Sequence, residues 1–548
     1  MAGLLQSNPC SLKTITIPAI PNYTGTWGNQ EVTHLLKRTL FGMKKQDLLY
    51  FSGKTLTQTV DELINPTAPL PAPPLKTYVN DNIAAGDPDL NIAIGQTWVD
   101  THTTDGTAQS RRRSSLKAWW LGLQLNQDRS IREKMVMFWH NHFAIETNDV
   151  SNARYYYRHV NLFRTYALGN FKTLVREVTM DSAMLVYLNG QLNTKAAPDE
   201  NYSRELQELF TLGKENNPNY TEDDVKTAAR VLTGWRNDAV NNKSYFDVAR
   251  HDTGNKVFSS FFNNTNIVGR NTADAGTLEL DDLLNMIFSK KAEVSNFIVK
   301  KLYRWFVYYE ITPAVETSVI KPLAQLLVDS NWDIKPVLRD LLMSQHFFDS
   351  SSRACYIKSP LDLSVGLIRE YNVVIPDAAD VVSQYNHWNN FRNLASNMQQ
   401  NLGDPPDVSG WKAYYQAPGF YEIWINSDTY PKRNQFTDQM VGNGYTFNSK
   451  RVVVDAVGYA RTLIAPHDPN ALISEIVQLI YSVPMSQSTR DQLKKDILLS
   501  GQTSDHYWTD AWTAYMAAPT NTALFNVVND RLKALLKYLM NLPEYHLI

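Results

Sequence analysis

The chain has 548 residues, 43% of them hydrophobic and 20% charged, and its formal net charge is -2 at pH 7. This length predicts a large globular protein, and the near-neutral charge argues against nucleic acid as a partner, because such binding requires a clustered basic surface. The only cysteines, Cys10 and Cys355, can form neither a disulfide framework nor a zinc site built on several thiolates.

The N-terminal residues lack the basic start and continuous apolar run of an export signal, and no later stretch is long enough to span a membrane. We therefore expect no membrane span and, for the sequence as it stands, a soluble cytoplasmic protein. Removal of an export signal would leave the same appearance and would place the protein outside the cell or on its surface.

Residues 1–75 are predicted to form an N-terminal helical unit, because apolar residues recur at helical spacing on both sides of a break at Gly42. This unit ends in the proline-rich segment 66–75, which should run extended as a linker or as a strap across a domain. Residues 76–236 are predicted to form the central helical core, which contains the segment Phe138–Phe143 and an unusually acidic helix.

Residues 237–280 change character and predict a β-hairpin insertion, with candidate strands at 245–248 and 256–262. A second helical region follows at 281–399, and residues 400–548 combine an aromatic-rich loop with C-terminal helices. The predicted fold class is mainly α, a multi-helical array or bundle with a small β-hairpin insertion.

The acidic helix, about residues 201–212, carries the first candidate site residues. At 100° per residue Glu205 falls inside the apolar stripe and Glu208 falls on its edge. A carboxylate on a buried face must be paired, protonated or bound to a metal. Arg204 could pair with Glu200 and Glu208 in a structural ladder, but this leaves Glu205 without a partner.

His140 and His142 lie at the end of a strongly apolar helix. On a continuous helix two residues of spacing separate the side chains by about 200°, so both imidazoles face one site only if the helix unwinds near His140. They are interpreted either as buried core residues or as metal ligands. His251 and Asp252 form another candidate pair, which could reach the same cleft from a turn or could be an Asx turn with a surface histidine.

These residues suit a divalent metal such as zinc, iron or manganese. The predicted metal ligands are His140, His142, Glu205 and His251. The predicted catalytic residues are Glu205, Glu208, Asp252 and Arg204, with Arg204 anchoring the helix or an anionic substrate. The function expected is a metal-dependent hydrolase or oxidoreductase acting on a substrate that the sequence does not identify. The alternative is a non-catalytic surface or assembly protein that uses the same residues as a polar network and binds a glycan or protein partner.

Several stretches together resemble the bacterial domain-of-unknown-function family 1800. The resemblance covers nearly the whole chain and is carried by His34–Gly42, Phe138–Phe143, Glu200–Gly213, Tyr220–Val225, Leu232–Trp235, His251-Asp252, Lys358–Pro360, Pro405-Pro406, Gly410-Trp411 and Arg433. The family has no assigned activity. Its members often carry export signals and are encoded beside a family that resembles alkaline phosphatases and sulfatases, which implies work at the cell envelope.

Two positions depart from the family pattern. The chain has Asp199 where the family has asparagine, a change that keeps a side chain able to cap the helix. It has Asn401-Leu402 where the family has glycine and glutamine ahead of the Pro-Pro motif. The second change weakens the case for a role of the loop at 403–411 in a site.

Overall fold

The computed structural model describes residues 19–214 and 219–548. It is an elongated, mainly helical molecule with small two-stranded sheets, which confirms the predicted fold class. Residues 1–18, which include Cys10 and the segment used above for localisation, lie outside the described residues. Within the described ranges no helix is both long and apolar enough to cross a bilayer.

The N-terminal unit contains the two predicted helical segments, separated at Gly42. The first is α1 (Asn29–Thr39), and the second is divided into α2 (Lys45–Ser52) and α3 (Leu56–Leu63). Thr55 caps α3 by accepting a hydrogen bond from the amide of Gln58. The proline-rich segment that follows is a strap, because Trp119 donates to the carbonyl of Ala72 (2.9 Å) and Arg132 donates to that of Ala68 (2.8 Å).

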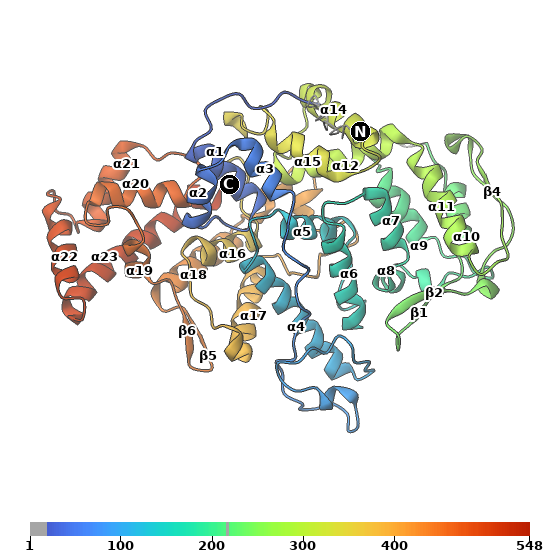
Figure 1. Cartoon of the computed structure of the whole chain (residues 1–548), viewed down its shortest axis with the longest axis horizontal. Coiled ribbons are helices and arrows are strands. Elements are labelled where there is room, and N and C mark those ends of the chain that lie inside the picture. Colours follow the sequence, from blue (N-terminus) through green and yellow to red (C-terminus); the bar gives the residue numbers. More distant parts are fainter. Residues whose placement is uncertain (1–18, 215–218) are drawn as a thin grey trace, which may run out of the picture.

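The central core places α5 in the middle of the molecule and α4 along α17 (Figure 1). Its helices are α4 (Gly106–Leu125), α5 (Arg132–His142), α6 (Ala153–Thr165), α7 (Phe171–Thr179), α8 (Ser182–Tyr187), α9 (Asn201–Glu205) and α10 (Glu222–Val231). Met135, Val136, Met137 and Phe138 project about 100° apart around α5, and each is at most 2% exposed. This helix is therefore an interior element, as its sequence predicts.

The predicted β insertion differs from the structure in its pairing. The two candidate strands do not pair with each other, because each belongs to its own short hairpin. β1 (Trp235–Asp238) pairs with β2 (Lys243–Phe246), and β3 (Lys256–Val257) pairs with β4 (Asn266–Ile267), both antiparallel. The sequence analysis also missed a third hairpin, β5 (Tyr445–Phe447) with β6 (Lys450–Val452).

The remaining helices extend the array from the centre to the far end of the molecule, where α19 to α23 gather (Figure 1). Their bounds are α11 (Ala275–Phe288), α12 (Lys291–Phe306), α13 (Pro313–Val315), α14 (Lys321–Asp329), α15 (Ile334–Met343), α16 (Pro360–Glu370), α17 (Val381–Asn397), α18 (Thr429–Gly442), α19 (Ala456–Arg461), α20 (Pro469–Ile480), α21 (Gln487–Leu493), α22 (His506–Ala517) and α23 (Thr522–Asn541).

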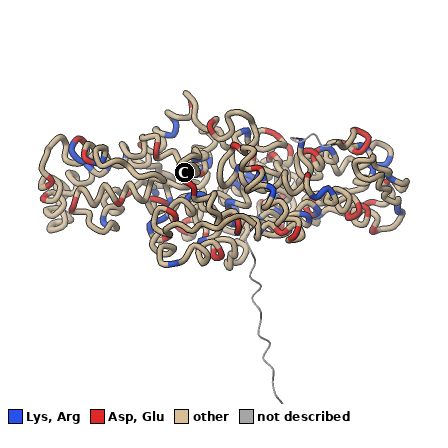
Figure 2. The backbone as a smooth tube through the Cα atoms, turned by 90° about the horizontal axis from the view of Figure 1, so that it is seen from above, with Lys and Arg blue, Asp and Glu red and all other residues tan. Residues whose placement is uncertain are grey.

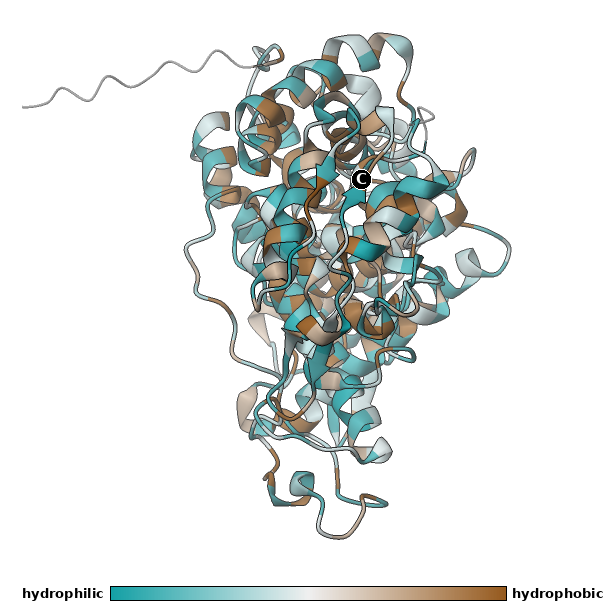
Figure 3. Cartoon of the chain, turned by 90° about the vertical axis from the view of Figure 1, so that its right-hand side faces the viewer, coloured by the Kyte–Doolittle hydropathy of each residue, from teal (hydrophilic) through white to brown (hydrophobic). Residues whose placement is uncertain are grey.

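Figure 2 shows basic and acidic residues mixed along the length of the molecule. Figure 3, which looks along the long axis, shows helices that carry both hydrophobic and hydrophilic residues. This is the arrangement expected of amphipathic helices that share a core, and one continuous cluster of buried apolar residues runs from Ile20 to Ile548.

Gly42 provides a test of how closely the N-terminal unit packs on α16. Its φ is +76°, and a Cβ built there would lie 2.5 Å from the Cα of Gly366. Gly86 also has a positive φ, +81°, but nothing lies within 4 Å of its would-be Cβ. The left-handed backbone alone costs an alanine about 1–2 kcal/mol. We expect Gly42→Ala to lower the free energy of unfolding by about 1–3 kcal/mol more than Gly86→Ala does.

Urea unfolding of the two variants and the parent measures this difference. Equal losses in the two variants would contradict the close contact between Gly42 and Gly366.

Candidate functional site

The acidic helix is not one continuous α-helix. It is α-helical through Glu205 and then changes to a π-helical segment, Leu206–Thr211, in which the amide of Leu212 donates to the carbonyl of Gln207 (2.9 Å). A π turn holds more residues than an α turn and therefore rotates the following side chains. Glu205 is only partly buried whereas Glu208 is 9% exposed, so the expected order of burial of these two residues was wrong.

Arg204 is engaged by carboxylates of the chain itself. Its guanidinium donates to both oxygens of Glu222 on α10 (2.8 and 2.7 Å) and to Glu200 (3.1 Å), and it lies 4.0 Å from Glu208. Glu208 also contacts Lys214. Glu200, Arg204 and Glu208 therefore form the structural ladder considered above, extended to α10 by Glu222, which the sequence analysis did not identify.

His140 is fully buried on α5 beside the rings of Trp120 and Trp411. The Tyr156 hydroxyl donates to the carbonyl of Gly403, so it accepts from Nε2 of His140 at 3.3 Å. Nδ1 of His140 has no hydrogen-bond partner. Burial lowers the pKa of His140 to about 3, so the imidazole is neutral at physiological pH.

His142 faces a different set of neighbours. Its Nε2 donates to the carbonyl of Phe210 (3.1 Å) and its Nδ1 accepts from the ammonium of Lys301 (3.0 Å). Burial lowers the pKa of His142 well below its ordinary value, and the Lys301 charge lowers it further. The helix continues through His142, so the two imidazoles diverge as a separation of about 200° requires.

The predicted metal ligands are therefore not brought together. Both ring nitrogens of His142 are occupied, and His140 offers a single nitrogen. Across residues 19–214 and 219–548 no three His, Cys, Asp or Glu side chains are grouped so that they could hold a metal ion. The first shell of His140, His142 and Glu205 expected from the sequence is not formed by these residues.

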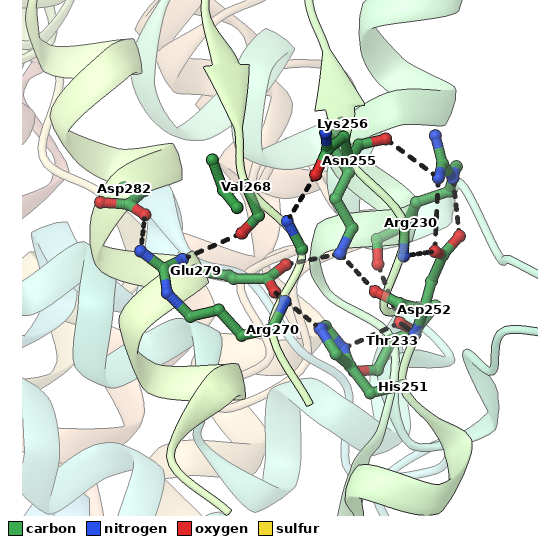
Figure 4. A network of polar contacts seen from close by, with 12 residues as sticks. Arg230, Thr233, His251, Asp252, Asn255, Lys256, Val268, Arg270, Glu279 and Asp282 are labelled. Carbon is green, nitrogen blue, oxygen red and sulfur yellow. Dashed lines mark hydrogen bonds and ion pairs between the residues drawn. The ribbon is translucent and has the colours of Figure 1, made fainter. Parts of the chain in front are cut away.

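His251 belongs to a separate buried network (Figure 4). Its Nδ1 donates to the carbonyl of Thr233 (2.9 Å), and its Nε2 lies 3.1 Å from Glu279 on α11. Lys256 on β3 also binds Glu279 (2.6 Å). Burial raises the pKa of the Glu279 carboxyl, but the hydrogen bonds from His251 and Lys256 outweigh this effect and leave the pKa below its ordinary value.

Asp252 points to the other side of that network and accepts from Nε of Arg230 (2.7 Å) and from the amide of Gly254 (2.8 Å). His251 is completely buried, so the interpretation as a surface histidine was wrong. His251 and Asp252 fasten the β3–β4 hairpin to α10 and α11, and neither has a contact with His140, His142 or Glu205. This pair is not part of a common site with them.

Another buried histidine, His159, was not predicted from the sequence and connects two other segments. Nδ1 of His159 on α6 lies 2.9 Å from Asp181, and its Nε2 lies 3.3 Å from the carbonyl of Phe143. Asp181 is the N-cap of α8, where it accepts from the amides of Ala183 and Met184. His159 precedes the buried Phe163 by four residues, and this helical spacing is the signal that could have identified it.

The loop at 403–411 lies against the end of α5. Asp404 accepts from the amide and hydroxyl of Thr147 (2.9 and 2.7 Å) and binds Lys117. Asn141 accepts from the amide of Trp411 (2.8 Å). Gly410 has a φ of +90°, and a Cβ there would lie 2.4 Å from the carbonyl oxygen of Asn141, so only glycine fits.

These contacts bring four carboxylates near the phenol of Tyr187, at the end of α8. Burial raises the pKa of Tyr187, and the charges of Glu146, Asp149, Asp407 and Glu205 raise it further. Glu146 and Asp149 lie in the loop between α5 and α6, Asp407 lies in the loop at 403–411, and Glu205 is the last residue of α9. We refer to Tyr187 and these four residues as the carboxylate site.

Glu146 and Glu205 are the partly buried members of the carboxylate site that have no protein partner. Both are partly buried, and neither side chain has a hydrogen bond or ion pair with another described residue. Burial raises the pKa of Glu146, with added repulsion from Asp149, Asp404 and Asp407. Burial likewise raises the pKa of Glu205, with added repulsion from Glu208. Partly buried carboxyls with raised pKa values and no structural partner are typical of acid–base sites.

The comparisons place the chain in one class of proteins. It belongs to the family described as protein of unknown function DUF1800, whose model matches residues 34–547. No curated protein and no solved structure matches it. Of the carboxylate site, Glu205 lies in one of the matching stretches named in the sequence analysis, and Asp407 lies between two of them.

The lowered pKa values of the buried histidines lead us to expect that the free energy of unfolding depends on pH. An unfolded histidine takes up a proton near pH 6.5, whereas folded His140 does so only near pH 3. The unfolded state thus binds more protons in this interval, so the free energy of unfolding should fall as the pH falls from about 6.5 towards 3. Each such residue contributes up to about 1.4 kcal/mol per pH unit. The His140→Gln variant should show a shallower slope than the parent.

Urea unfolding at a series of pH values measures this slope, with His506→Gln as the exposed control that should keep the parental slope. An unchanged slope in the His140 variant would contradict a neutral, buried imidazole.

Proposed function

We propose that the chain is a hydrolase whose acid–base chemistry is carried by carboxyl groups at the carboxylate site, and that its substrate is a glycan. The observation that carries the proposal is the pair Glu146 and Glu205, which come from distant segments, both raise the pKa of the Tyr187 phenol and have no hydrogen bond or ion pair with a described residue. Glu205 keeps the catalytic role assigned to it in the sequence analysis.

Glycoside hydrolysis is a reaction that two protein carboxyls can perform without another group. One carboxyl donates a proton to the leaving oxygen, and the other acts as the base for water or as the nucleophile. A raised pKa keeps the proton on the acid to a higher pH than an ordinary glutamate would. The nearby Asp149 and Asp407 add negative charge that would stabilise the positive charge of the oxocarbenium-like transition state.

Aromatic side chains at the carboxylate site also favour a sugar. Tyr187 is partly buried within the site, and Tyr415 is 37% exposed beside it, where its hydroxyl donates to Asp407 (2.8 Å). Tyrosine offers both an apolar face and a polar edge, the combination that a pyranose ring requires. The histidines hold the surrounding segments in place in this proposal and take no part in proton transfer.

A second candidate function is a non-catalytic assembly protein. The observation that favours it is that His251, Lys256 and Glu279 are completely buried and bind one another, which is the structural polar network considered above. That network lies apart from the carboxylate site, so it leaves Glu146 and Glu205 unexplained. The same experiment separates the two functions.

The test is turnover of a panel of nitrophenyl glycosides, followed by the absorbance of released nitrophenol. We expect the parent to hydrolyse a member of the panel, and Glu146→Gln and Glu205→Gln each to lose about 10²–10⁴-fold in kcat. The melting temperature should be unchanged or slightly higher in both variants, because neither carboxyl has a partner to lose and each repels its neighbours.

Glu200→Gln is the matched control, since Glu200 lies just before α9, is partly exposed and is paired with Arg204. This variant should keep the parental kcat. No hydrolysis of any glycoside, or retained turnover in Glu146→Gln and Glu205→Gln, would contradict the proposal and favour the assembly protein.

A further inference from the structure

A second group of buried charges lies where the C-terminal segment returns to α1. It consists of Lys37 on α1, Lys358 just before α16, Glu370 at the end of α16, Arg433 on α18 and His546 in the last turn, Pro543–His546. We call it the cation cluster. All five side chains are at most 5% exposed. In Figure 1 the C-terminus lies beside α1 and α2, and the amide of Lys358 donates to the carbonyl of His546 (2.8 Å).

Most polar atoms of the cation cluster have no hydrogen-bond partner. The unpartnered atoms are Nζ of Lys37, Nζ of Lys358, Nε and Nη1 of Arg433, both ring nitrogens of His546 and Oε1 of Glu370. The contacts that do exist are few: Arg433 donates to the carbonyl of Lys358 (2.9 Å), and Tyr545 donates to Glu370 (3.1 Å). Buried polar atoms are almost always satisfied, by protein, water or a ligand.

The cation cluster also has more positive than negative charge. Lys37, Lys358 and Arg433 face a single carboxylate of the cluster, Glu370, which lies 3.6 Å from Nζ of Lys358. The next carboxylate, Asp362, is already bound by Lys134 and accepts from the hydroxyl of Ser359 (2.9 Å). Burying unpaired charge of one sign is costly, so this arrangement calls for an anion.

The pKa values of Lys37 and Arg433 are lowered, which is the direction expected of buried cations without a counterion. Burial lowers the pKa of Lys37 to about 7, and the charge of Lys358 lowers it further against the opposing effect of Glu370. Burial likewise lowers the pKa of Arg433 to about 10, with Asp362 opposing. An anion among these groups would relieve both shifts.

A cavity adjoins the cation cluster. It has a volume of about 330 Å³ and is bordered by Glu370, Tyr371 and Tyr459, among others. The hydroxyls of both tyrosines are buried and unpartnered. The cavity is large enough to admit water and small ions, and Glu370 is the one residue of the cation cluster that lines it.

We propose that the cation cluster is an internal binding site for a small tetrahedral oxyanion, such as phosphate or sulfate. Ammonium and guanidinium groups are donors without acceptors, and a tetrahedral oxyanion presents acceptor oxygens in several directions. Lys37, Lys358 and Arg433 come from three elements distant in the sequence, so the bound ion would join α1, α16 and α18 to the C-terminal segment. This site is separate from the carboxylate site, and its test is independent of hydrolysis.

The test is thermal unfolding of the full chain in phosphate and in chloride at equal ionic strength and pH. We expect the melting temperature of the parent to rise with phosphate concentration and to change little with chloride, because a ligand that binds only the folded state stabilises it. Lys37→Met should abolish the rise. It should still fold, since methionine matches the buried stem and removes a charge that has no partner.

Lys256→Met is the matched control, because Lys256 is equally buried but paired with Glu279. It should lower the melting temperature and keep the phosphate response. Lys226→Met, at an exposed position, is a second control that should keep the phosphate response even if Lys256→Met does not fold. An equal response to phosphate and chloride in the parent, or a phosphate response retained in Lys37→Met, would overturn the proposal.

Discussion

The structure around the carboxylate site depends on the burial of neutral imidazole at the end of α5. His140 and His142 sit in an aromatic interior that cannot hold their charged forms, so each acts as a hydrogen-bonding group of fixed direction. His140 reaches the loop at 403–411 through Tyr156, and His142 reaches the carbonyl of Phe210. Together with His159, which connects Phe143 to α8, they join segments that are far apart in the sequence.

This arrangement explains why Glu146 and Glu205 have no partners. The backbone that carries each residue is fixed by hydrogen bonds made by its neighbours, Thr147 and Phe210, so the carboxyls do not need to contribute to the packing. Glu208, one turn further on, has the opposite role and binds Arg204 and Lys214. A carboxylate with ionic partners, Glu208, and one without a protein partner, Glu205, therefore lie on the same helix.

The helical fold and the importance of Phe138–Phe143 and the acidic helix could be predicted from the sequence, because both depend on local periodicity and composition. The arrangement of the site could not. The π turn after Glu205 changes which carboxylate is buried, and an ideal 100° projection cannot include it. Arg204 pairs with Glu222 and His251 pairs with Glu279, but each glutamate lies on another helix. The sequence alone does not show how these helices pack.

The most direct test of the central claim is a nuclear magnetic resonance titration of the imidazole nitrogens of His140 and His142 in histidine-labelled protein, with and without Zn²⁺. We expect both rings to stay neutral from pH 7 down to the onset of acid unfolding, and we expect Zn²⁺ to leave their resonances unchanged. Protonation with a midpoint near 6.5, or a shift of both rings on addition of stoichiometric Zn²⁺, would contradict it.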